Sequence, residues 1–451
     1  THPTSKACYH GGDLADLMSQ PAYLDGLGVT AIWMTPMFRN DWVQGEGTAF
    51  VSAGYHGYWQ IDYSRIDPHF GTNAEMQSFI DAAHARGIKV FFDIVANHTG
   101  DLISYAEGTD AYISKADQPY RDADGVEFDD RDFAGSGTFP DLDPAVSFPY
   151  TPVVNGDKFP DWLDDPIYYH NRGNSSFTGE NSLYGDFFGL DDLFTEHPVV
   201  EDGLIDIYKG MISDFGIDGF RIDTVKHVND EFWEAFVAEI DAHAAAEGKS
   251  EFFYFGEVFD GDPGFLSRFT TELDLPGVLD FGFHGAALGF AANSNAATGL
   301  QSFFAGDDWF TDEDSSAHGL PNFIGNHDVG RFGYFIDQAN PGASDAERVA
   351  RAELGYALMF TSRGMPVVYY GDEQGFTGDG GDKLARQDMF ANAVPEYADD
   401  DLIGTDATTS DDNFDPTHPI YQALADYAAL YSSHVALRTG AQIHRAAVDG
   451  V

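Results

Sequence analysis

The chain has 451 residues, of which 43% are hydrophobic and 15% aromatic, so it is a globular protein that can bury a large core. Its 75 acidic residues outnumber its 23 basic ones and give a net charge of −52, which argues against a nucleic-acid partner, because phosphates are neutralised by basic patches. No apolar run is long enough to span a membrane, and the single cysteine, Cys8, excludes an intrachain disulfide.

The acidic residues are spread along the whole chain and are not gathered in a tail. Self-repulsion on this scale destabilises a compact chain at low salt, and added salt screens it. We therefore predict a halophilic protein. The alternative is a protein that is merely acidic.

Short β-rich segments alternate with helical segments along the chain. The predicted strands comprise residues 30–36, 89–98, 219–225, 251–259, 278–284, 320–328 and 366–373. The predicted helices comprise residues 74–87, 198–216, 230–248 and 419–437. Strands that alternate with helices predict an α/β protein with a parallel sheet, and enough repeats predict a (β/α)₈ TIM barrel.

The spacing of these elements predicts the domain organisation. The predicted strands are one fewer than a barrel needs, so we expect the first barrel strand upstream of residue 1. The connection from His98 to Gly219 is far longer than a βα loop, which predicts an irregular inserted domain, domain B, at residues 99–195 after barrel strand 3. The barrel then comprises residues 1–98 and 196–438, and residues 439–451 form a short tail or begin another domain.

Polar side chains lie near the ends of several predicted strands. His98, Asp223, Glu257 and Asp328 follow or close four different strands, and the C-terminal ends of barrel strands are where active sites form. Three acids at a barrel mouth permit a magnesium site for enolate chemistry or a carboxylate pair for glycoside cleavage. The alternative for each acid is that it caps a helix or pairs locally.

The neighbours of these acids favour glycoside cleavage. Arg221 and Asp223 point to the same face of a strand, where the guanidinium would keep the carboxylate charged and oriented, as a nucleophile requires. Phe220 and Ile222 should then face the helices. A magnesium cage would gain nothing from an adjacent cation. The segment "YHGYW" (55–59) offers aromatic faces for stacking on a sugar ring, or is simply an aromatic core patch.

Five segments resemble the conserved regions of glycoside hydrolase family 13, the alpha-amylase family, in the order found there. They are "DIVANHTG" (93–100), "GLDDL" (189–193), "GFRIDTVKH" (219–227), "FGEVFDG" (255–261) and "FIGNHD" (323–328). The resemblance implies cleavage of α-1,4-glucosidic bonds of starch or maltooligosaccharides by double displacement, with retention of configuration.

The resemblance also assigns roles to individual residues. Asp223 would be the nucleophile, Glu257 the acid and base, and Asp328 the residue that stabilises the transition state. Arg221 would fix the nucleophile, and Asp93 would be its structural partner. The remaining residues implied for substrate binding are Tyr58, His56, His98 and His327 around the cleaved sugar, and Lys226, His227 and Phe259 on the leaving-group side.

The same resemblance implies calcium as a cofactor. Asn97 and Asp192 match side-chain ligands, and His227 matches a ligand that acts through its backbone carbonyl. Asp13 resembles a ligand of a second calcium loop, although a helix N-cap is an alternative for it.

Other functions stay open at this point. A transglycosylating relative, such as a cyclodextrin glucanotransferase or a maltogenic enzyme, is kept open by Phe188, which falls about where cyclodextrin-forming relatives keep a central aromatic. The commoner explanation for this residue is a core or rim Phe. A catalytically inactive scaffold would lack one of the three acids, and a metal-dependent lyase would bind magnesium through Asp223 and Glu257. We expect a secreted, extracellular monomer from a halophile, without a nucleic-acid or membrane partner.

Overall fold

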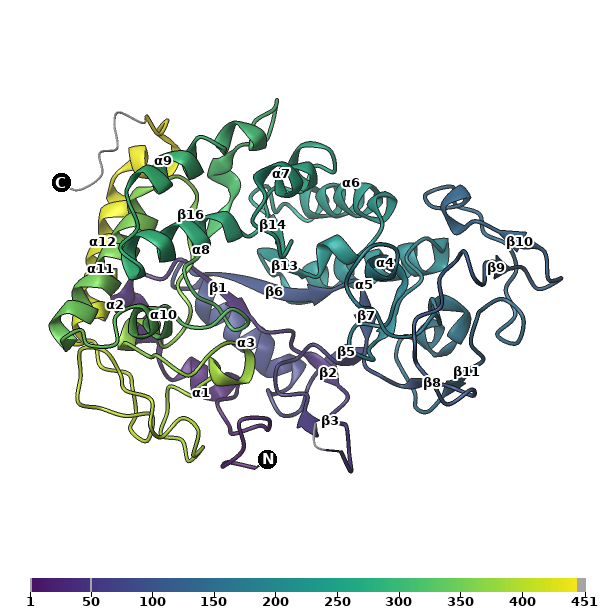
Figure 1. The fold of residues 1–451 in the computed structure, drawn as a ribbon, viewed down its shortest axis with the longest axis horizontal. Coiled ribbons are helices and arrows are strands. Elements are labelled where there is room, and N and C mark those ends of the chain that lie inside the picture. Colours follow the sequence, from purple (N-terminus) through teal and green to yellow (C-terminus); the bar gives the residue numbers. More distant parts are fainter. Residues whose placement is uncertain (1, 49–50, 444–451) are drawn as a thin grey trace. The chain divides into compact units, whose positions relative to one another are not determined.

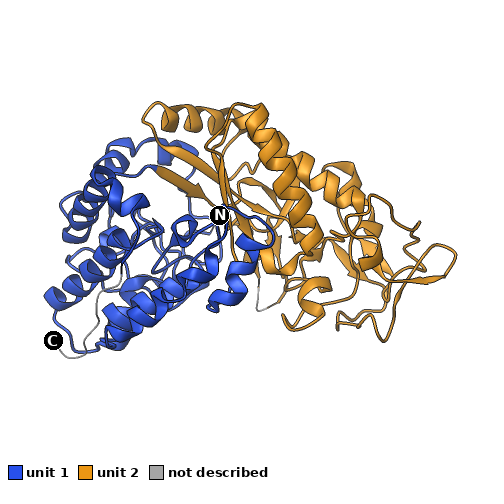
Figure 2. Ribbon diagram, turned by 90° about the horizontal axis from the view of Figure 1, so that it is seen from above, with its two compact units in different colours: residues 1–30, 259–451 blue, residues 31–258 orange. Residues whose placement is uncertain are grey.

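The computed structural model describes residues 2–48 and 51–443 (Figure 1). The chain divides into two compact units (Figure 2): unit 1 comprises Thr1–Thr30 and Phe259–Val451, and unit 2 comprises Ala31–Val258. These bounds differ from the predicted domain bounds at residues 98, 195 and 438, and that division stays a prediction. Within the predicted tail at 439–451, residues 444–451 lie outside the described residues.

A parallel sheet forms the centre of unit 2. Its four strands lie in the order β1 (Ala31–Met34), β6 (Lys89–Val95), β13 (Gly219–Asp223) and β14 (Phe253–Gly256) (Figure 1). Helices α3 (Asn73–His84), α5 (Pro198–Phe215) and α6 (Asp230–Ala246) precede β6, β13 and β14 along the chain. The predicted strands and helices in this part of the sequence are confirmed, with bounds shorter by a few residues.

Local sequence explains where these elements begin and how they pack. Thr72 and Glu75 form a capping box at the start of α3. In β13, Phe220 lies 6.0 Å from the ring of Tyr208 on α5 and 6.5 Å from that of Phe236 on α6. The prediction that Phe220 faces the helices is therefore confirmed, and the opposite face of β13 is left to Arg221 and Asp223.

The long connection between β6 and α5 contains only short elements. They are β7 (His98–Thr99), β8 (Ile103–Tyr105), β9 (Tyr120–Arg121), β10 (Glu127–Phe128), β11 (Pro152–Val154), α4 (Asn181–Tyr184), β12 (Asp191–Asp192) and three 3₁₀ turns. The strands pair antiparallel as β7–β12, β8–β11 and β9–β10. Irregular structure was expected here, and its standing as a separate domain B stays a prediction.

Another part of unit 2 was not predicted. Between β1 and α3 the chain forms β2 (Phe38–Asn40), β3 (Val43–Gln44), β4 (Ser52–Ala53) and β5 (Gln60–Ile66). These strands pair antiparallel as β2–β5 and β3–β4, and register shifts interrupt the first pair. The shifts break the alternation of apolar and polar residues by which a strand is recognised in sequence.

Unit 1 is mainly helical. Its helices are α1 (Leu14–Met18), α2 (Pro21–Leu27), α7 (Pro263–Thr271), α8 (Phe281–Ala287), α9 (Thr298–Phe304), α10 (Phe332–Ala339), α11 (Asp345–Thr361), α12 (Pro419–Ser433) and α13 (Val435–Thr439). Phe283, Phe332, Met359, Ile403 and Leu424 belong to one buried cluster in this unit. The parallel pair β15 (Pro321–Asn322) and β16 (Met365–Pro366) is also in unit 1. The helix predicted at 419–437 is confirmed as α12 and the start of α13.

Three strand predictions in unit 1 need correction. Residues 278–284 were expected as a strand, but only Asp280 bridges a strand residue, and α8 begins at Phe281. The reason is a cap, because Asp280 accepts a 2.7 Å hydrogen bond from the backbone N–H of Phe283. The strands expected at 320–328 and 366–373 are reduced to β15 and β16, each two residues long. In the described ranges, no helix combines the length and apolarity needed to cross a membrane.

Candidate active site

Arg221 is the centre of a buried polar cluster in unit 2. Register places it opposite Asp93 on β6, and its Nη1 donates to Asp93 Oδ1 at 3.0 Å. The same nitrogen donates to Asp223 Oδ1 at 2.6 Å, and Nη2 donates to Glu257 Oε2. Its guanidinium lies 5.2 Å from the ring of Trp33. One cation therefore binds three carboxyl groups from β6, β13 and the end of β14.

The two acids predicted to perform catalysis are joined by the backbone as well. Glu257 donates from its N–H to the carbonyl of Ile222 at 2.7 Å, and Val225 donates to the carbonyl of Glu257 at 3.0 Å. Thr224, which directly follows Asp223, has a left-handed φ of 53°. A β-branched residue enters this region at a cost of roughly 1–2 kcal/mol, so the turn after the nucleophile candidate is strained.

Electrostatics keep Asp223 ionised. Burial is the largest single effect and opposes its ionisation, but the Arg221 charge, together with smaller contributions from His98 and from hydrogen bonds, holds the pKa of Asp223 below its ordinary value. For Asp93, burial is the stronger effect and raises the pKa to about 7, against the Arg221 charge. Asp223 is thus the carboxyl of this pair that stays ionised, as a nucleophile for glycoside cleavage requires.

The residues predicted around the cleaved sugar lie near this cluster. Tyr58 donates its hydroxyl to Asp93 Oδ2 at 2.8 Å, and its ring stacks on His56 with centroids 5.8 Å apart. His98 stacks on Phe187 at 5.3 Å, and His227 contacts the same Phe187 at 5.3 Å. Lys226 is half-buried on the 3₁₀ turn Val225–His227.

His98 is a neutral hydrogen-bonding group. Burial lowers its pKa to about 4, so the imidazole carries no charge near neutral pH. Its Nδ1 lies 3.2 Å from the side-chain amide nitrogen of Asn97, a donor, and in the tautomer that accepts this hydrogen bond the ring proton is on Nε2. Nε2 is buried and has no hydrogen-bond partner within the described chain, so its N–H is available to a sugar hydroxyl.

Asp328 and His327 lie in unit 1. The backbone N–H of Asp328 donates a 2.9 Å hydrogen bond to the side-chain oxygen of Asn326, which fixes the loop. Its carboxylate is 3.2 Å from His327 Nε2 and accepts from Arg386 Nη2 at 3.2 Å. Phe259, also in unit 1, packs on Phe281 at 4.6 Å and is half exposed. Arg386 lies outside every motif, and no local pattern marked it.

The predicted calcium ligands in unit 2 lie in a region rich in buried carboxylates. The backbone N–H of Leu193, next to Asp192, donates to the carbonyl of Asn97 at 2.9 Å. The buried acids of this stretch are Asp186, Asp191, Asp192 and Glu196. The cations that contact them are Lys158, 2.5 Å from Asp191, and His170, which lies 2.6 Å from Asp192 and 3.0 Å from Glu196.

Burial, with a further contribution from neighbouring carboxylates, raises the pKa of Asp186 to about 8 and that of Asp192 to about 7. Oxygen donors with unbalanced negative charge fit a hard divalent cation such as Ca²⁺. The residues present therefore fit the predicted metal.

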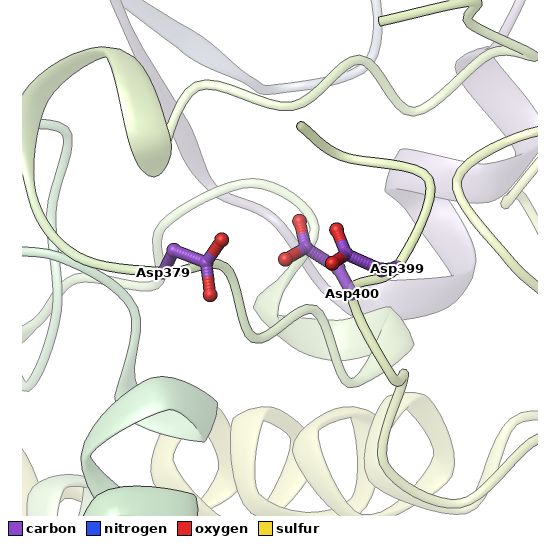
Figure 3. Close-up of side chains that lie close together, drawn as sticks. All are labelled: Asp379, Asp399 and Asp400. Carbon is purple, nitrogen blue, oxygen red and sulfur yellow. The ribbon is translucent and has the colours of Figure 1, made fainter. Parts of the chain in front are cut away.

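Two other acidic features of unit 1 bear on metal binding. Asp13 caps α1, accepting from the backbone N–H groups of Ala15 at 3.0 Å and Asp16 at 3.1 Å, which is the N-cap alternative for this residue. Figure 3 shows that Asp379, Asp399 and Asp400 gather their carboxylates, whose oxygens lie within 4.8 Å of one another. This cluster includes none of the predicted ligands.

Comparison with known proteins decides the family. The family model "Alpha amylase, catalytic domain" matches residues 3–416. The chain belongs to the alpha-amylase family. An alpha-amylase from Streptomyces lividans is 48% identical over 453 residues, which cover 99% of this chain and 49% of that protein. A cyclomaltodextrin glucanotransferase from Niallia circulans is 30% identical over 396 residues, covering 86% of this chain and 47% of that protein.

A solved structure of an alpha-amylase from Geobacillus thermoleovorans, complexed with acarbose, matches with a TM-score of 0.68 and 26% identity, over 97% of this chain and 76% of that chain. The family fold is the (β/α)₈ barrel, and the chain shares it. The chain spans between 28% and 49% of the length of these curated relatives. The resemblance to glycoside hydrolase family 13, seen in the sequence motifs, is therefore confirmed.

Proposed function

We propose that the chain is the catalytic part of a retaining α-glucan hydrolase that cleaves α-1,4 bonds of starch and maltooligosaccharides. The observation that carries this proposal is the double contact of Arg221, which bonds Asp223 and Glu257 through two nitrogens of one guanidinium. Carboxyl groups held this close match the short separation of retaining enzymes, whereas inverting enzymes leave room for a water between them. The 48% identical alpha-amylase supports the substrate class.

The reaction proceeds in two displacements. Asp223 attacks the anomeric carbon and forms a glucosyl ester while Glu257 gives its proton to the leaving glycosidic oxygen. Glu257 then takes a proton from water, whose oxygen attacks the anomeric carbon and releases Asp223. Asp328 stabilises the positive charge of the transition state, and the Nε2–H of His98 holds a sugar hydroxyl. The pKa of Asp223, held low, suits a nucleophile that stays ionised in weak acid.

A transglycosylating enzyme is the second candidate. Phe188 has 78% of its surface exposed and a left-handed φ of 56°, beside the rings of Phe177 and Phe187. A large apolar ring held in a strained conformation and exposed to solvent is a platform on which an acceptor sugar can stack. The 30% identical cyclomaltodextrin glucanotransferase is the relative that favours this candidate.

The proposal also includes a bound metal ion, adaptation to high salt and an extracellular location. Ca²⁺ would be held by Asn97, Asp192 and the carbonyl of His227, where it would neutralise buried carboxylates of residues 186–196. The net charge of −52 supports a protein adapted to high salt. We place it outside the cell, as a monomer that meets its polymeric substrate there.

The experiment is a time course of products from soluble starch at high salt, followed by proton NMR. The proposal expects α-anomers first, which then mutarotate, and linear products of decreasing length. Early β-anomers would reject the retaining mechanism. Cyclic or elongated products would replace the hydrolase with the transglycosylating enzyme.

A further inference from the structure

The buried cluster around Arg221 contains more negative than positive charge. Asp93, Asp223 and Glu257 have side chains that are 0%, 10% and 11% exposed, and the cation that contacts all three is Arg221. With every carboxyl ionised, the cluster would carry three negative charges and one positive charge, a net charge of −2, at low solvent exposure. Such clusters retain a proton, and the contacts decide which carboxyl holds it.

Two of the three side chains that contact the Asp93 carboxyl can only donate hydrogen bonds. Asp93 Oδ2 accepts from Trp33 Nε1 at 2.9 Å and from the Tyr58 hydroxyl at 2.8 Å. Asp93 Oδ1 accepts from Arg221 Nη1 at 3.0 Å. An indole N–H and a guanidinium can only donate, so they favour the ionised form. Burial works in the opposite direction, and the balance is close, because the pKa of Asp93 is about 7.

Trp33 is held firmly in its place. It lies on β1, where it is the register partner of Phe91 on β6, and its ring meets that of Phe255 edge-on at 5.7 Å. The face of the same indole lies 5.2 Å from the Arg221 guanidinium. Trp33 therefore contacts both members of one ion pair: its ring lies against Arg221, and its N–H donates to Asp93.

We propose that Trp33 is a positioning residue: its indole N–H keeps Asp93 ionised, and ionised Asp93 keeps the shared proton on Glu257. This inference rests on the proposed function, in which Glu257 is the proton donor. Because Asp93 and Glu257 bind the same guanidinium, a proton taken up by Asp93 removes a negative charge from the cluster and makes Glu257 a stronger acid. The titratable and charged groups that face the cluster within unit 2 are Tyr58, Asp93, His98, Arg221, Asp223, Lys226, His227 and Glu257.

The test is Trp33→Phe, which keeps a ring but removes the N–H. We expect the basic limb of the pH profile of kcat/KM, measured on a maltooligosaccharide, to move by about 0.5–1 pH unit toward lower pH. Asp93→Asn removes the negative charge and should move the limb in the same direction. In the Asp93→Asn background, Trp33→Phe should produce no further movement. A limb that stays in place, or that moves again in that background, overturns the proposal.

Trp233→Phe is the matched control. Trp233 donates its indole N–H to a backbone carbonyl, that of Val225, at 3.0 Å, and it is fully buried in the same unit. Its replacement removes a buried indole hydrogen bond without touching a carboxyl, so the limb should not move. If Trp33→Phe does not fold, Tyr58→Phe removes the other neutral donor to Asp93 Oδ2 and should move the limb in the same direction.

A second readout does not depend on turnover. The infrared carbonyl band of protonated Glu257, identified as the band that Glu257→Gln removes, can be titrated in the resting enzyme. Its midpoint should fall in Trp33→Phe, and an unchanged midpoint overturns the proposal. If the wild-type chain does not cleave α-glucans, the proposed function is wrong. The infrared titration still tests whether Trp33 keeps the proton on Glu257.

Discussion

At the scale of single residues, the acids of unit 2 separate into two groups with different expected roles. Glu257 contacts Arg221 in the candidate active site, and Asp192 contacts His170 in the predicted calcium region. A metal-dependent lyase would use Glu257 as a metal ligand, whereas the proposed hydrolase would not. Two isosteric amide variants can therefore distinguish catalysis from metal binding.

Glu257→Gln should lower kcat by about 10²–10⁴-fold, because the proton donor is lost. It should keep the rise in melting temperature that Ca²⁺ produces in the wild type. Asp192→Asn is its counterpart and should lose most of that rise. Calorimetry with Ca²⁺ and with a chelator, beside starch assays, checks both variants. A Glu257→Gln protein that no longer responds to Ca²⁺ would support the lyase instead.

The sequence allowed the Arg221–Asp223 pair to be predicted because both residues lie on one strand and share a face at a spacing of two. Asp93 was expected as the partner of Arg221 through the family resemblance, and the structure confirms that contact. Trp33 and Arg386 also contact the candidate site residues, but their partners lie far away in sequence. Their positions follow from strand register and loop packing, which no local pattern encodes. Asp13 is a local motif that had two interpretations, because the same short sequence suits a calcium ligand and a helix N-cap. The structure shows the N-cap.

At the scale of elements, long helices and long strands were predicted well, and short ones were not. The helices α3, α5, α6 and α12 have apolar stripes over several turns, so their signal accumulates. The segment at 278–284 has apolar residues suited to a strand or to a buried helix. Asp280 decided between them through a cap and an ion pair with Arg363, a partner distant in sequence.

A buried acid links α2 to the 3₁₀ turn Asp372–Gln374 in unit 1. Tyr23 on α2 donates its hydroxyl to Glu373 Oε1 at 2.7 Å, and Tyr421 on α12 donates to the carbonyl of Tyr23 at 2.6 Å. Burial raises the pKa of Glu373 from 4.5 to about 7. The folded state thus favours protonated Glu373. This stabilisation is complete below pH 4.5 and is lost as the pH rises through about 7.

Glu373→Gln cannot lose a proton, so the variant should not lose this part of the stability. Its melting temperature relative to wild type should rise as the pH goes from 4.5 to above 7. Calorimetry across that range checks the difference. Glu313→Gln, at an exposed acid, is the control and should give no such trend. A constant difference between Glu373→Gln and wild type would contradict the argument.

At the scale of the whole molecule, charge should dominate stability. The net charge of −52 is distributed along the chain, so repulsion acts throughout the folded protein. Salt of 1 M shortens the screening length to about 3 Å. We expect the melting temperature to rise by roughly 10 °C between 0.1 M and 2 M NaCl, the shift that about 10 kcal/mol produces in a chain of this size. Full stability in dilute buffer would reject adaptation to high salt and favour the alternative of a protein that is merely acidic.

The turn at Thr224 has a consequence for how the reaction starts. A left-handed residue directly after Asp223 means that the backbone, together with Arg221, aims the carboxylate. The Asp223 side chain therefore loses conformational entropy when the chain folds, and it loses little more when the sugar binds. The stability of the turn and the orientation of the nucleophile therefore depend on the same residue. A substitution that removes the backbone strain at Thr224 would stabilise the turn but leave the Asp223 carboxylate less well oriented.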